Sequence, residues 1–202
     1  MQDARVPKQM LTAEQAILQM LGEVQPLTQS VSVPLNNALD RVLAQPVVSD
    51  INVPGYDNAA MDGYALCAAD VKPDVRLAVA GTALAGHAFA NPVPAGCCVR
   101  ITTGAVLPEG LDTVEMQEQV ALSETDQQQS ILCQLQPTMG EHVRRAGEDI
   151  AKGAEVFTAG HKLRPADIGL LASLGIASVN VLRQLKVAIF SSGDELVAPG
   201  QK

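Results

Sequence analysis

The pattern of apolar residues between Val47 and about Val143 constrains the fold more than any other feature of the sequence. Apolar residues come there in short runs that Gly, Pro and Asn separate, as in Leu77-Ala-Val-Ala80, Cys98-Val-Arg-Ile101 and Ile131-Leu-Cys-Gln-Leu135. Short runs bounded by turn formers are typical of β-strands. Aromatic residues make up only 2% of the chain, so we expect an all-β unit with an aliphatic core.

Helix signals mark the segments on either side of this unit. Thr12-Ala-Glu-Gln15 is a capping box that begins one helix, and Pro165 suits the first turn of another. We expect residues 8–46 and 147–182 to pack together as one discontinuous mixed α/β domain, with 47–146 inserted into it as an all-β domain. The apolar face of the first helix needs a partner, and we expect it to pack against the Pro165–Leu174 region or its neighbouring strands, and not against the strands of 77–135.

Smaller elements are expected within the mixed domain. Ser30–Val33 and Ala177–Val181 both show the apolar–polar alternation of strands. Asn36 or Asn37 is placed to cap a short helix that runs through Leu43.

Four polar blocks carry the candidate chemistry, and they follow one another in this order: Asn58–Ala65, Arg100–Gly110, Arg144–Ile150 and Phe190–Leu196. The first block lies in a segment, 52–65, that holds both tyrosines of the chain and two turn signals. The last block follows an apolar strand expected at Lys186–Phe190. Ligands of open α/β sheets bind at the carboxyl ends of strands, which favours a binding role for this block.

The carboxylates of these blocks come in pairs: Asp57 with Asp62, Glu148 with Asp149, and Asp194 with Glu195. Such hard oxygen ligands suit Mg²⁺ beside substrate phosphates. Each pair also has an ordinary structural alternative. The first would cap turns, the second would pair with Arg144 and Arg145 in an exposed charged turn, and the third would cap a helix.

Other residues of the blocks are candidate ligands for an anion. The hydroxyl and N–H groups of Thr102-Thr-Gly104 suit an oxyanion, and the alternative is a plain β-turn. The guanidinium groups of Arg100, Arg144 and Arg145 match phosphate geometry, and the alternative is a charged surface.

Together, the four blocks closely resemble those of the molybdopterin molybdenumtransferase family, bacterial MoeA and the matching domain of gephyrin, over nearly the whole chain. The resemblance implies an α+β multidomain fold in which residues 183–202 begin a truncated α/β molybdopterin-binding domain. It implies a transferase of molybdenum cofactor biosynthesis that inserts molybdate into adenylylated molybdopterin, releases AMP and needs Mg²⁺. This chain would be the N-terminal fragment of such an enzyme, inactive alone.

The resemblance assigns roles one position at a time. The catalytic positions are Asp62, Thr103, Asp149 and Glu195, and the metal ligands are Asp62, Asp149 and Glu195. The expected cofactor-binding residues are Arg100, Arg144, Arg145, Ser192, Gly193 and Asp194. One departure from the family pattern is Glu115, which replaces an apolar residue. A buried unpaired carboxylate is costly, so we expect Glu115 to face solvent or a partner.

Charge and composition argue against several other classes of protein. A net charge of −8 opposes binding to nucleic acid or to anionic membranes. No apolar run is long enough for a membrane span, and the first residues lack the apolar stretch of a signal peptide, so we expect a cytoplasmic protein. The four cysteines lack Cys-x-x-Cys spacing, which predicts reduced thiols and no zinc site.

The family also implies a homodimer, with molybdopterin adenylyltransferase as an upstream partner. Two alternatives stay open. One is a noncatalytic, gephyrin-like scaffold that dimerises and binds a peptide, and the other is a generic oxyanion-binding module. The four polar blocks favour an enzyme, because a pure scaffold has no need of them.

Overall fold

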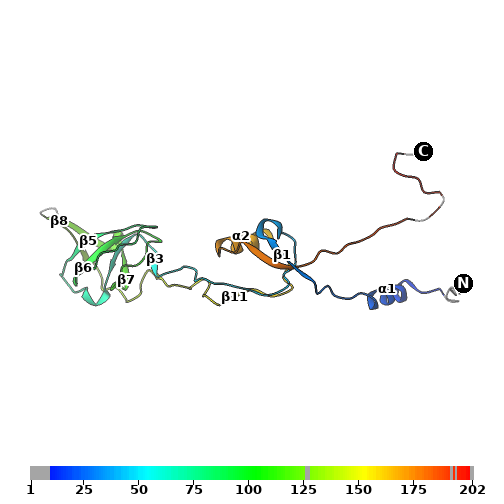
Figure 1. Ribbon diagram of the computed structural model, residues 1–202. Coiled ribbons are helices and arrows are strands. Elements are labelled where there is room, and N and C mark those ends of the chain that lie inside the picture. Colours follow the sequence, from blue (N-terminus) through cyan, green and yellow to red (C-terminus); the bar gives the residue numbers. More distant parts are fainter. Residues whose placement is uncertain (1–9, 126–127, 192, 194, 201–202) are drawn as a thin grey trace. The chain divides into compact units, whose positions relative to one another are not determined.

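The computed structural model describes residues 10–125, 128–191, 193 and 195–200 (Figure 1). The chain divides into two compact units, one formed by residues 1–45 and 159–202 and the other by residues 46–158. The first unit is thus assembled from two segments that lie far apart in the sequence. Helices and sheets are both present, so the fold is mixed α/β.

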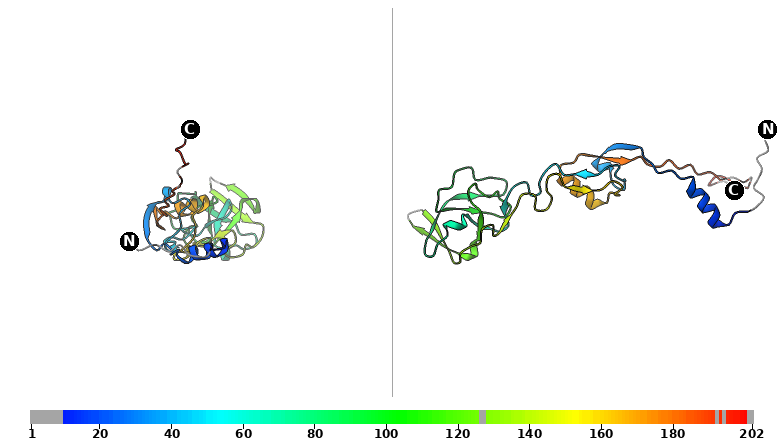
Figure 2. Two further views of the ribbon diagram at one scale, coloured as in Figure 1. Left: turned by 90° about the vertical axis from the view of Figure 1, so that its right-hand side faces the viewer. Right: turned by 90° about the horizontal axis from the view of Figure 1, so that it is seen from below.

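The first unit joins its two segments through an antiparallel strand pair. Strand β1 (Ser30–Pro34) pairs with β12 (Ser178–Leu182), with Val33 opposite Val179, and the blue and orange strands lie side by side in the right-hand view of Figure 2. The segment around Leu43 extends this pair, because Leu43 bridges Val181. The buried hydrophobic residues of this unit are Ala38, Leu43, Leu163, Leu171, Leu174, Val179 and Val181.

Helix α2 (Pro165–Ser173) covers part of this core through Leu171, which is fully buried. Its start is fixed by Pro165 at the first helical turn and by Asp167, which accepts a hydrogen bond from the Arg164 N–H at 2.9 Å. Gly175, at a φ of +74°, ends the helix in the left-handed conformation that glycine adopts most readily.

Helix α1 (Ala13–Gly22) has the predicted capping box at Thr12 and Gln15, with hydrogen bonds of 3.0 and 3.2 Å. None of its residues is buried, and Leu18 and Leu21 are 70% and 62% exposed. The expected burial of its apolar face on the Pro165–Leu174 region or its neighbouring strands is therefore absent from the structure. The short helix expected through Leu43 is also wrong, because only a 3-10 turn, η1 (Leu35–Asn37), forms.

The second unit is built around a curled six-stranded sheet with the order β7-β4-β6-β5-β9-β8. β5 and β6 run parallel, and the other neighbouring pairs run antiparallel. The strands are β4 (Gly63–Leu66), β5 (Leu77–Ala83), β6 (Cys97–Ile101), β7 (Thr113–Met116), β8 (Val120–Thr125) and β9 (Gln128–Cys133). Two further 3-10 turns are η2 (Ala68–Asp70) and η3 (Gln117–Gln119).

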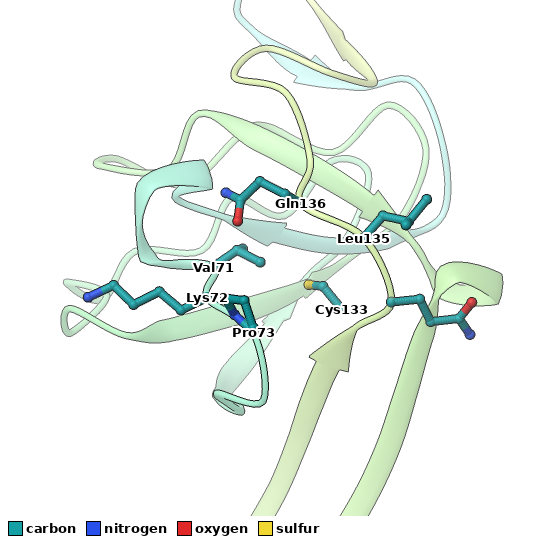
Figure 3. Close-up of a pocket in the computed structure, with 7 residues that line it drawn as sticks. Val71, Lys72, Pro73, Cys133, Leu135 and Gln136 are labelled. Atoms are coloured by element: carbon teal, nitrogen blue, oxygen red, sulfur yellow. The ribbon is translucent and has the colours of Figure 1, made fainter.

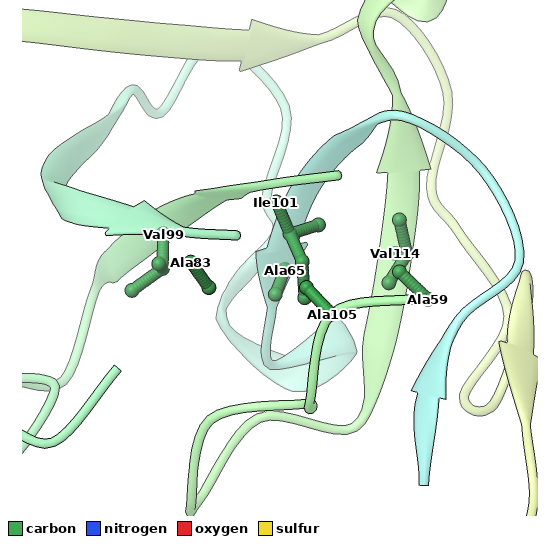
Figure 4. Packing of buried hydrophobic residues seen from close by; sticks show 7 residues of the cluster. All are labelled: Ala59, Ala65, Ala83, Val99, Ile101, Ala105 and Val114. Carbon is green, nitrogen blue, oxygen red and sulfur yellow. The ribbon is translucent and has the colours of Figure 1, made fainter. Parts of the chain in front are cut away.

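Both faces of this sheet are packed. Successive side chains of a strand point to opposite faces, and the two hydrophobic clusters divide β4 accordingly. Ala65 belongs to the cluster drawn in Figure 4, with Val99, Ile101 and Val114 among its members, whereas Tyr64 and Leu66 belong to the other. The core is mainly aliphatic, as the composition predicts, and Tyr64, Cys98 and Phe89 contribute to it.

The contact between β4 and β7 leaves no room for a side chain at Gly63. A Cβ at this position would lie less than 2 Å from the carbonyl oxygen of Glu115. Glu115 itself is only 5% exposed, so the expectation that it faces solvent is wrong at the level of the residue. Burial raises the pKa of this carboxyl group, and a hydrogen bond from the Met116 backbone acts in the opposite direction.

Two short strand pairs connect this sheet to the ends of the second unit. β3 (Asn58–Ala59) pairs with β10 (Val143–Arg144), and β2 (Val47–Val48) pairs with β11 (Glu155–Phe157). Because the chain after residue 147 keeps pairing with the chain before residue 54, the second unit extends to residue 158 rather than ending at the expected 146.

Residues 183–191 form no strand, so the strand predicted at Lys186–Phe190 is wrong. Its apolar side chains are largely exposed, and Ile189 and Phe190 are 90% and 89% exposed. An isolated strand has no backbone hydrogen bonds, and this segment has no sheet to join in the described structure. No helix in the described part of the chain has the length and apolar character that a membrane span needs.

Candidate functional site

The first candidate site lies in the second unit and joins two turns. Asp62 ends the turn between β3 and β4, and Thr103 follows β6. The Asp62 Oδ1 atom accepts a hydrogen bond from the Thr103 N–H at 2.7 Å and another from the Thr103 hydroxyl at 2.8 Å. These bonds, the backbone bond foremost, hold the pKa of Asp62 below its ordinary value of 3.8.

Backbone bonds hold these two turns in place. Gly104 N–H donates to the Ala59 carbonyl at 2.8 Å, and Ala59 N–H donates to the Ala105 carbonyl at 3.0 Å. Arg100 on β6 lies near enough for its charge to contribute to the lowered pKa of Asp62. The site is therefore an exposed, negatively charged carboxylate with a hydroxyl and an arginine beside it.

The second candidate site is the charged turn that follows β10. Arg144 Nη2 donates to Asp149 Oδ2 at 2.6 Å, and Arg144 Nε lies 3.9 Å from Glu148 Oε1. The side chains of Arg144 and Asp149 are 42% and 51% exposed. This matches the exposed charged turn that the sequence offered as the alternative to a metal-binding role. The pairing with Asp149 raises the pKa of Arg144. It also holds a guanidinium and a carboxylate together at the surface.

The sequence suggested that Asp57 and Asp62 form a pair, but the structure gives Asp57 other partners. Its two oxygens accept hydrogen bonds from Arg145 Nη1 at 2.6 Å and from the Ala146 N–H at 2.8 Å. No local signal in the sequence joins Asp57 to a partner 88 residues away, so this contact was missed. Asp57 belongs with the second site.

The remaining predicted residues lie in or near the C-terminal segment. Ser192 and Asp194 lie outside the described residues. Glu195 and Gly193 are described and belong to the first unit, whereas Asp62 and Asp149 belong to the second. Within the described residues, no group of three or more His, Cys, Asp or Glu side chains is arranged to hold a metal ion.

One oxygen of each predicted metal ligand in the second unit is still available. Asp62 Oδ2 and Asp149 Oδ1 accept no hydrogen bond within the described part of the chain, because the bonds in this region end on the other oxygens. Mg²⁺ is commonly coordinated by one or two such carboxylate oxygens together with the phosphate oxygens of a substrate.

A small cavity elsewhere in the second unit is separate from these sites. It has a volume of about 130 Å³ and is lined by Val71, Lys72, Pro73, Cys133, Gln134, Leu135 and Gln136 (Figure 3). Burial raises the pKa of the Cys133 thiol to about 11, so this thiol is protonated and unreactive at neutral pH. All four cysteines are free, as predicted.

The fold and the order of the polar turns define a class of protein. The family model described as the MoeA N-terminal region (domain I and II) matches residues 11–175. The chain belongs to this family.

Individual relatives carry a more particular name. Molybdopterin molybdenumtransferase of Haemophilus influenzae is 45% identical over 192 residues, which cover 95% of this chain and 47% of the relative. Molybdopterin molybdenumtransferase 2 of Mycobacterium tuberculosis is 36% identical, with 93% and 45% covered. The chain thus spans about half the length of the curated relatives it matches.

Solved structures agree with this assignment. A crystal structure of the molybdopterin biosynthesis MoeA protein from Pyrococcus horikoshii is similar with a TM-score of 0.83 and 32% identity, covering 96% of this chain and 50% of that one. Another crystal structure of a molybdopterin biosynthesis MoeA protein from Pyrococcus horikoshii OT3 gives a TM-score of 0.73 and 31% identity, covering 86% of this chain and 46% of that one.

Proposed function

We propose that this chain is the N-terminal part of a molybdopterin molybdenumtransferase, which inserts molybdate into adenylylated molybdopterin and releases AMP. The observation that carries the proposal is the pair of exposed, preformed polar sites, Asp62 with Thr103 and Arg144 with Asp149, in a chain of the MoeA family. The Haemophilus influenzae relative, of which this chain spans 47%, is named molybdopterin molybdenumtransferase.

The reaction asks a protein to hold two anionic substrates in contact and to neutralise charge as the adenylate leaves. Arg100 and Arg144 supply positive charge at each of the two sites, and Arg145 lies next to Arg144 in the chain. The Thr103 hydroxyl and N–H are already aimed at an anionic oxygen, that of Asp62. Glu195, Gly193, Ser192 and Asp194 complete the proposed set from the C-terminal block.

We propose Mg²⁺ from the chemistry of the individual carboxylate donors. Asp62 and Asp149 each offer a carboxylate oxygen without a hydrogen bond from the described residues, and Glu195 is the third proposed ligand. When bound, Mg²⁺ would stabilise negative charge on the departing phosphate. The residues themselves would orient the anions and keep the carboxylates ionised.

We further propose a cytoplasmic homodimer that receives its substrate from molybdopterin adenylyltransferase. Support for self-association comes from α1, whose Leu18 and Leu21 are mostly exposed although the helix is properly capped. Apolar surface of this kind is typical of interaction sites. Sedimentation of the protein with both leucines replaced by Glu tests this, and an unchanged oligomeric state would contradict it.

The proposed enzyme also has a domain plan. The second unit would be an all-β domain inserted into the first, and residues 183–202 would begin the molybdopterin-binding domain. The exposed apolar side chains of Val187, Ile189 and Phe190 support this, because exposed apolar surface of this kind is typical of sites that contact other parts of a protein.

A chimera tests the proposed activity directly. Residues 1–202 replace the matching half of the Haemophilus influenzae relative, and the purified product is incubated with molybdate, Mg²⁺ and adenylylated molybdopterin. We expect AMP release from the chimera and none from residues 1–202 alone. A folded chimera without activity, or full activity of residues 1–202 alone, would contradict the proposal.

The second candidate is a noncatalytic, gephyrin-like scaffold, for which the exposed α1 face is the favouring observation. Isothermal titration of adenylylated molybdopterin into the chimera separates the two. A scaffold would dimerise without binding the nucleotide, whereas a module for oxyanions alone would bind molybdate and ignore the pterin.

A further inference from the structure

We propose that Asp57 is a positioning residue, which holds Arg145 and the turn after it so that Arg144 and Asp149 meet an anionic substrate. The inference rests on the proposed function, because the anion is the adenylylated pterin named there. It gives the two adjacent arginines different roles. Arg144 contacts the substrate, and Arg145 supports it.

Both oxygens of Asp57 are committed to this turn. Oδ2 accepts from Arg145 Nη1 at 2.6 Å, and Oδ1 accepts from the Ala146 N–H at 2.8 Å. The Ala146 bond is the largest cause of a lowered pKa for Asp57, followed by Arg145. Asp57 is therefore charged at neutral pH, and each of its two oxygens already accepts a hydrogen bond from this turn.

Arg145 is held on three sides. Its guanidinium reaches Asp57, and its own backbone N–H donates to Glu148 Oε2 at 2.9 Å. A Cβ on Gly140 would lie 3.0 Å from Arg145 Nη2, so the guanidinium rests against the backbone of that turn. A residue whose side chain and backbone are both bonded within the fold suits support better than capture of a ligand.

The backbone of the same turn is tied to the segment before Asp57. Gly147 N–H donates to the Pro54 carbonyl at 2.9 Å, and Asp149 N–H donates to the Val53 carbonyl at 2.9 Å. Lys152 N–H donates to Asn52 Oδ1 at 2.7 Å. These hydrogen bonds hold the backbone of residues 145–152 against residues 52–54, and they thereby fix the position of the Asp149 carboxylate.

Arg144 is held less firmly within the fold than Arg145. Among the described residues its guanidinium binds Asp149 and, at 3.9 Å, Glu148, and its side chain is 42% exposed. An anion that arrives here competes with Asp149 for the guanidinium. An Asp149 carboxylate released in this way could bind a cation. Binding of the anion would thus make both the Arg144 guanidinium and the Asp149 carboxylate available to ligands.

Nuclear magnetic resonance of the 202-residue protein tests the positioning role without any activity. In Asp57→Ala we expect the Ala146 amide to exchange at least about tenfold faster and the Arg144 guanidinium signals to lose their ion-paired pattern. Asp57→Asn keeps an acceptor for Ala146 and should lose only the Arg145 contact. Asp50→Asn, at an exposed aspartate of the same unit, is the matched control.

Kinetics of the chimera supply the second readout. Asp57→Ala should raise the KM for adenylylated molybdopterin about tenfold, with a smaller change in kcat. Loss of a residue that orients a ligand-binding side chain typically has an effect of this size on affinity. The same substitution in an Arg144→Ala background should add little, and Arg145→Lys should restore part of what Arg145→Ala loses.

The outcomes separate the two proposals. An inactive native chimera would overturn the proposed function, and the resonance experiment would still decide the role of Asp57. An active chimera whose KM and Arg144 signals do not respond to Asp57→Ala would overturn the positioning role. If Asp57→Ala fails to fold, Asp57→Asn carries the same comparison.

Discussion

Thr103 donates its backbone N–H and its hydroxyl to one and the same oxygen of Asp62, at 2.7 and 2.8 Å. The second oxygen of Asp62 accepts no hydrogen bond in the described structure. The carboxylate is thus oriented by one oxygen and offers the other to a ligand. Because the pKa of Asp62 lies below its ordinary value, the group is charged at neutral pH.

Asp62→Asn should separate activity from stability. The amide oxygen can still accept from Thr103, so the melting temperature should stay within about 2 °C of the parent. The lost charge should lower kcat/KM of the chimera by about tenfold or more. Calorimetry and AMP release measure the two effects. A large drop in melting temperature with unchanged activity per folded molecule would make Asp62 a structural residue.

Gly63→Ala should destabilise the second unit severely. The added Cβ would overlap the Glu115 carbonyl oxygen, and backbone atoms on two paired strands cannot both move away. We expect a loss of about 3 kcal/mol or more in denaturant unfolding. Gly169→Ala is the matched control, because a Cβ there meets no atom within 4 Å and the position is helical. This control should be neutral or stabilising by up to about 1 kcal/mol.

Glu115→Gln should stabilise the protein at neutral pH. Burial, and then the charge of Glu141, raise the pKa of Glu115 above its ordinary value of 4.5. The folded state therefore prefers the neutral side chain, and its stability falls as the pH rises through the folded-state pKa. We expect the variant to melt about 3 °C higher at pH 7, with the gain vanishing near pH 4. Glu124→Gln, on the exposed face of β8, should show no such gain.

Asp167→Asn should weaken the first unit at neutral pH and matter less in acid. Hydrogen bonds from the Arg164 side chain, from His161 at 2.8 Å and from the Arg164 N–H hold the pKa of Asp167 well below 3.8. The ionised group thus adds stability above pH 3.8 that is lost as the pH falls toward the folded-state pKa. Thermal melts followed by circular dichroism from pH 2 to 7 should show the curves of parent and variant converging in acid.

Asp40→Asn is the control for that series. Asp40 also forms an ion pair, with Lys162 at 2.8 Å, but both side chains are more than 60% exposed. Exposed pairs contribute little to stability. An Asp40 effect as large as that of Asp167 would contradict the role assigned to the buried carboxylate.

Local signals predicted the elements that local physics determines. The capping box at Thr12 and the helix start at Pro165 formed as expected, because each satisfies backbone groups within one turn. The strand at Ala177–Val181 formed one residue later, at Ser178–Leu182. Lys186–Phe190 failed for the opposite reason, since a strand depends on neighbours that the sequence of the strand does not specify.

The candidate sites also combine features that the local sequence determines with features that distant partners determine. The turn chemistry of Asp62 and Thr103 was visible in the sequence, although the two lie far apart in it. Arg144 and Arg145 looked equivalent there, yet only Arg145 reaches Asp57. Adjacent residues of an extended chain point in opposite directions, so distant partners decided their roles. The burial of Glu115 depended likewise on the long-range pairing of β7 with β4.

The antiparallel pairing of β1 with β12 has a consequence for synthesis on the ribosome. Ser30–Pro34 emerges long before Ser178–Leu182, and at about 5–20 residues per second the wait is on the order of 10 s. Meanwhile the chain from 46 to 158 acquires every strand of its own sheet and can close it. Residues 30–43 instead lack their partner strand β12 during this time, so the speed of translation through the second unit sets how long Leu43 stays without Val181.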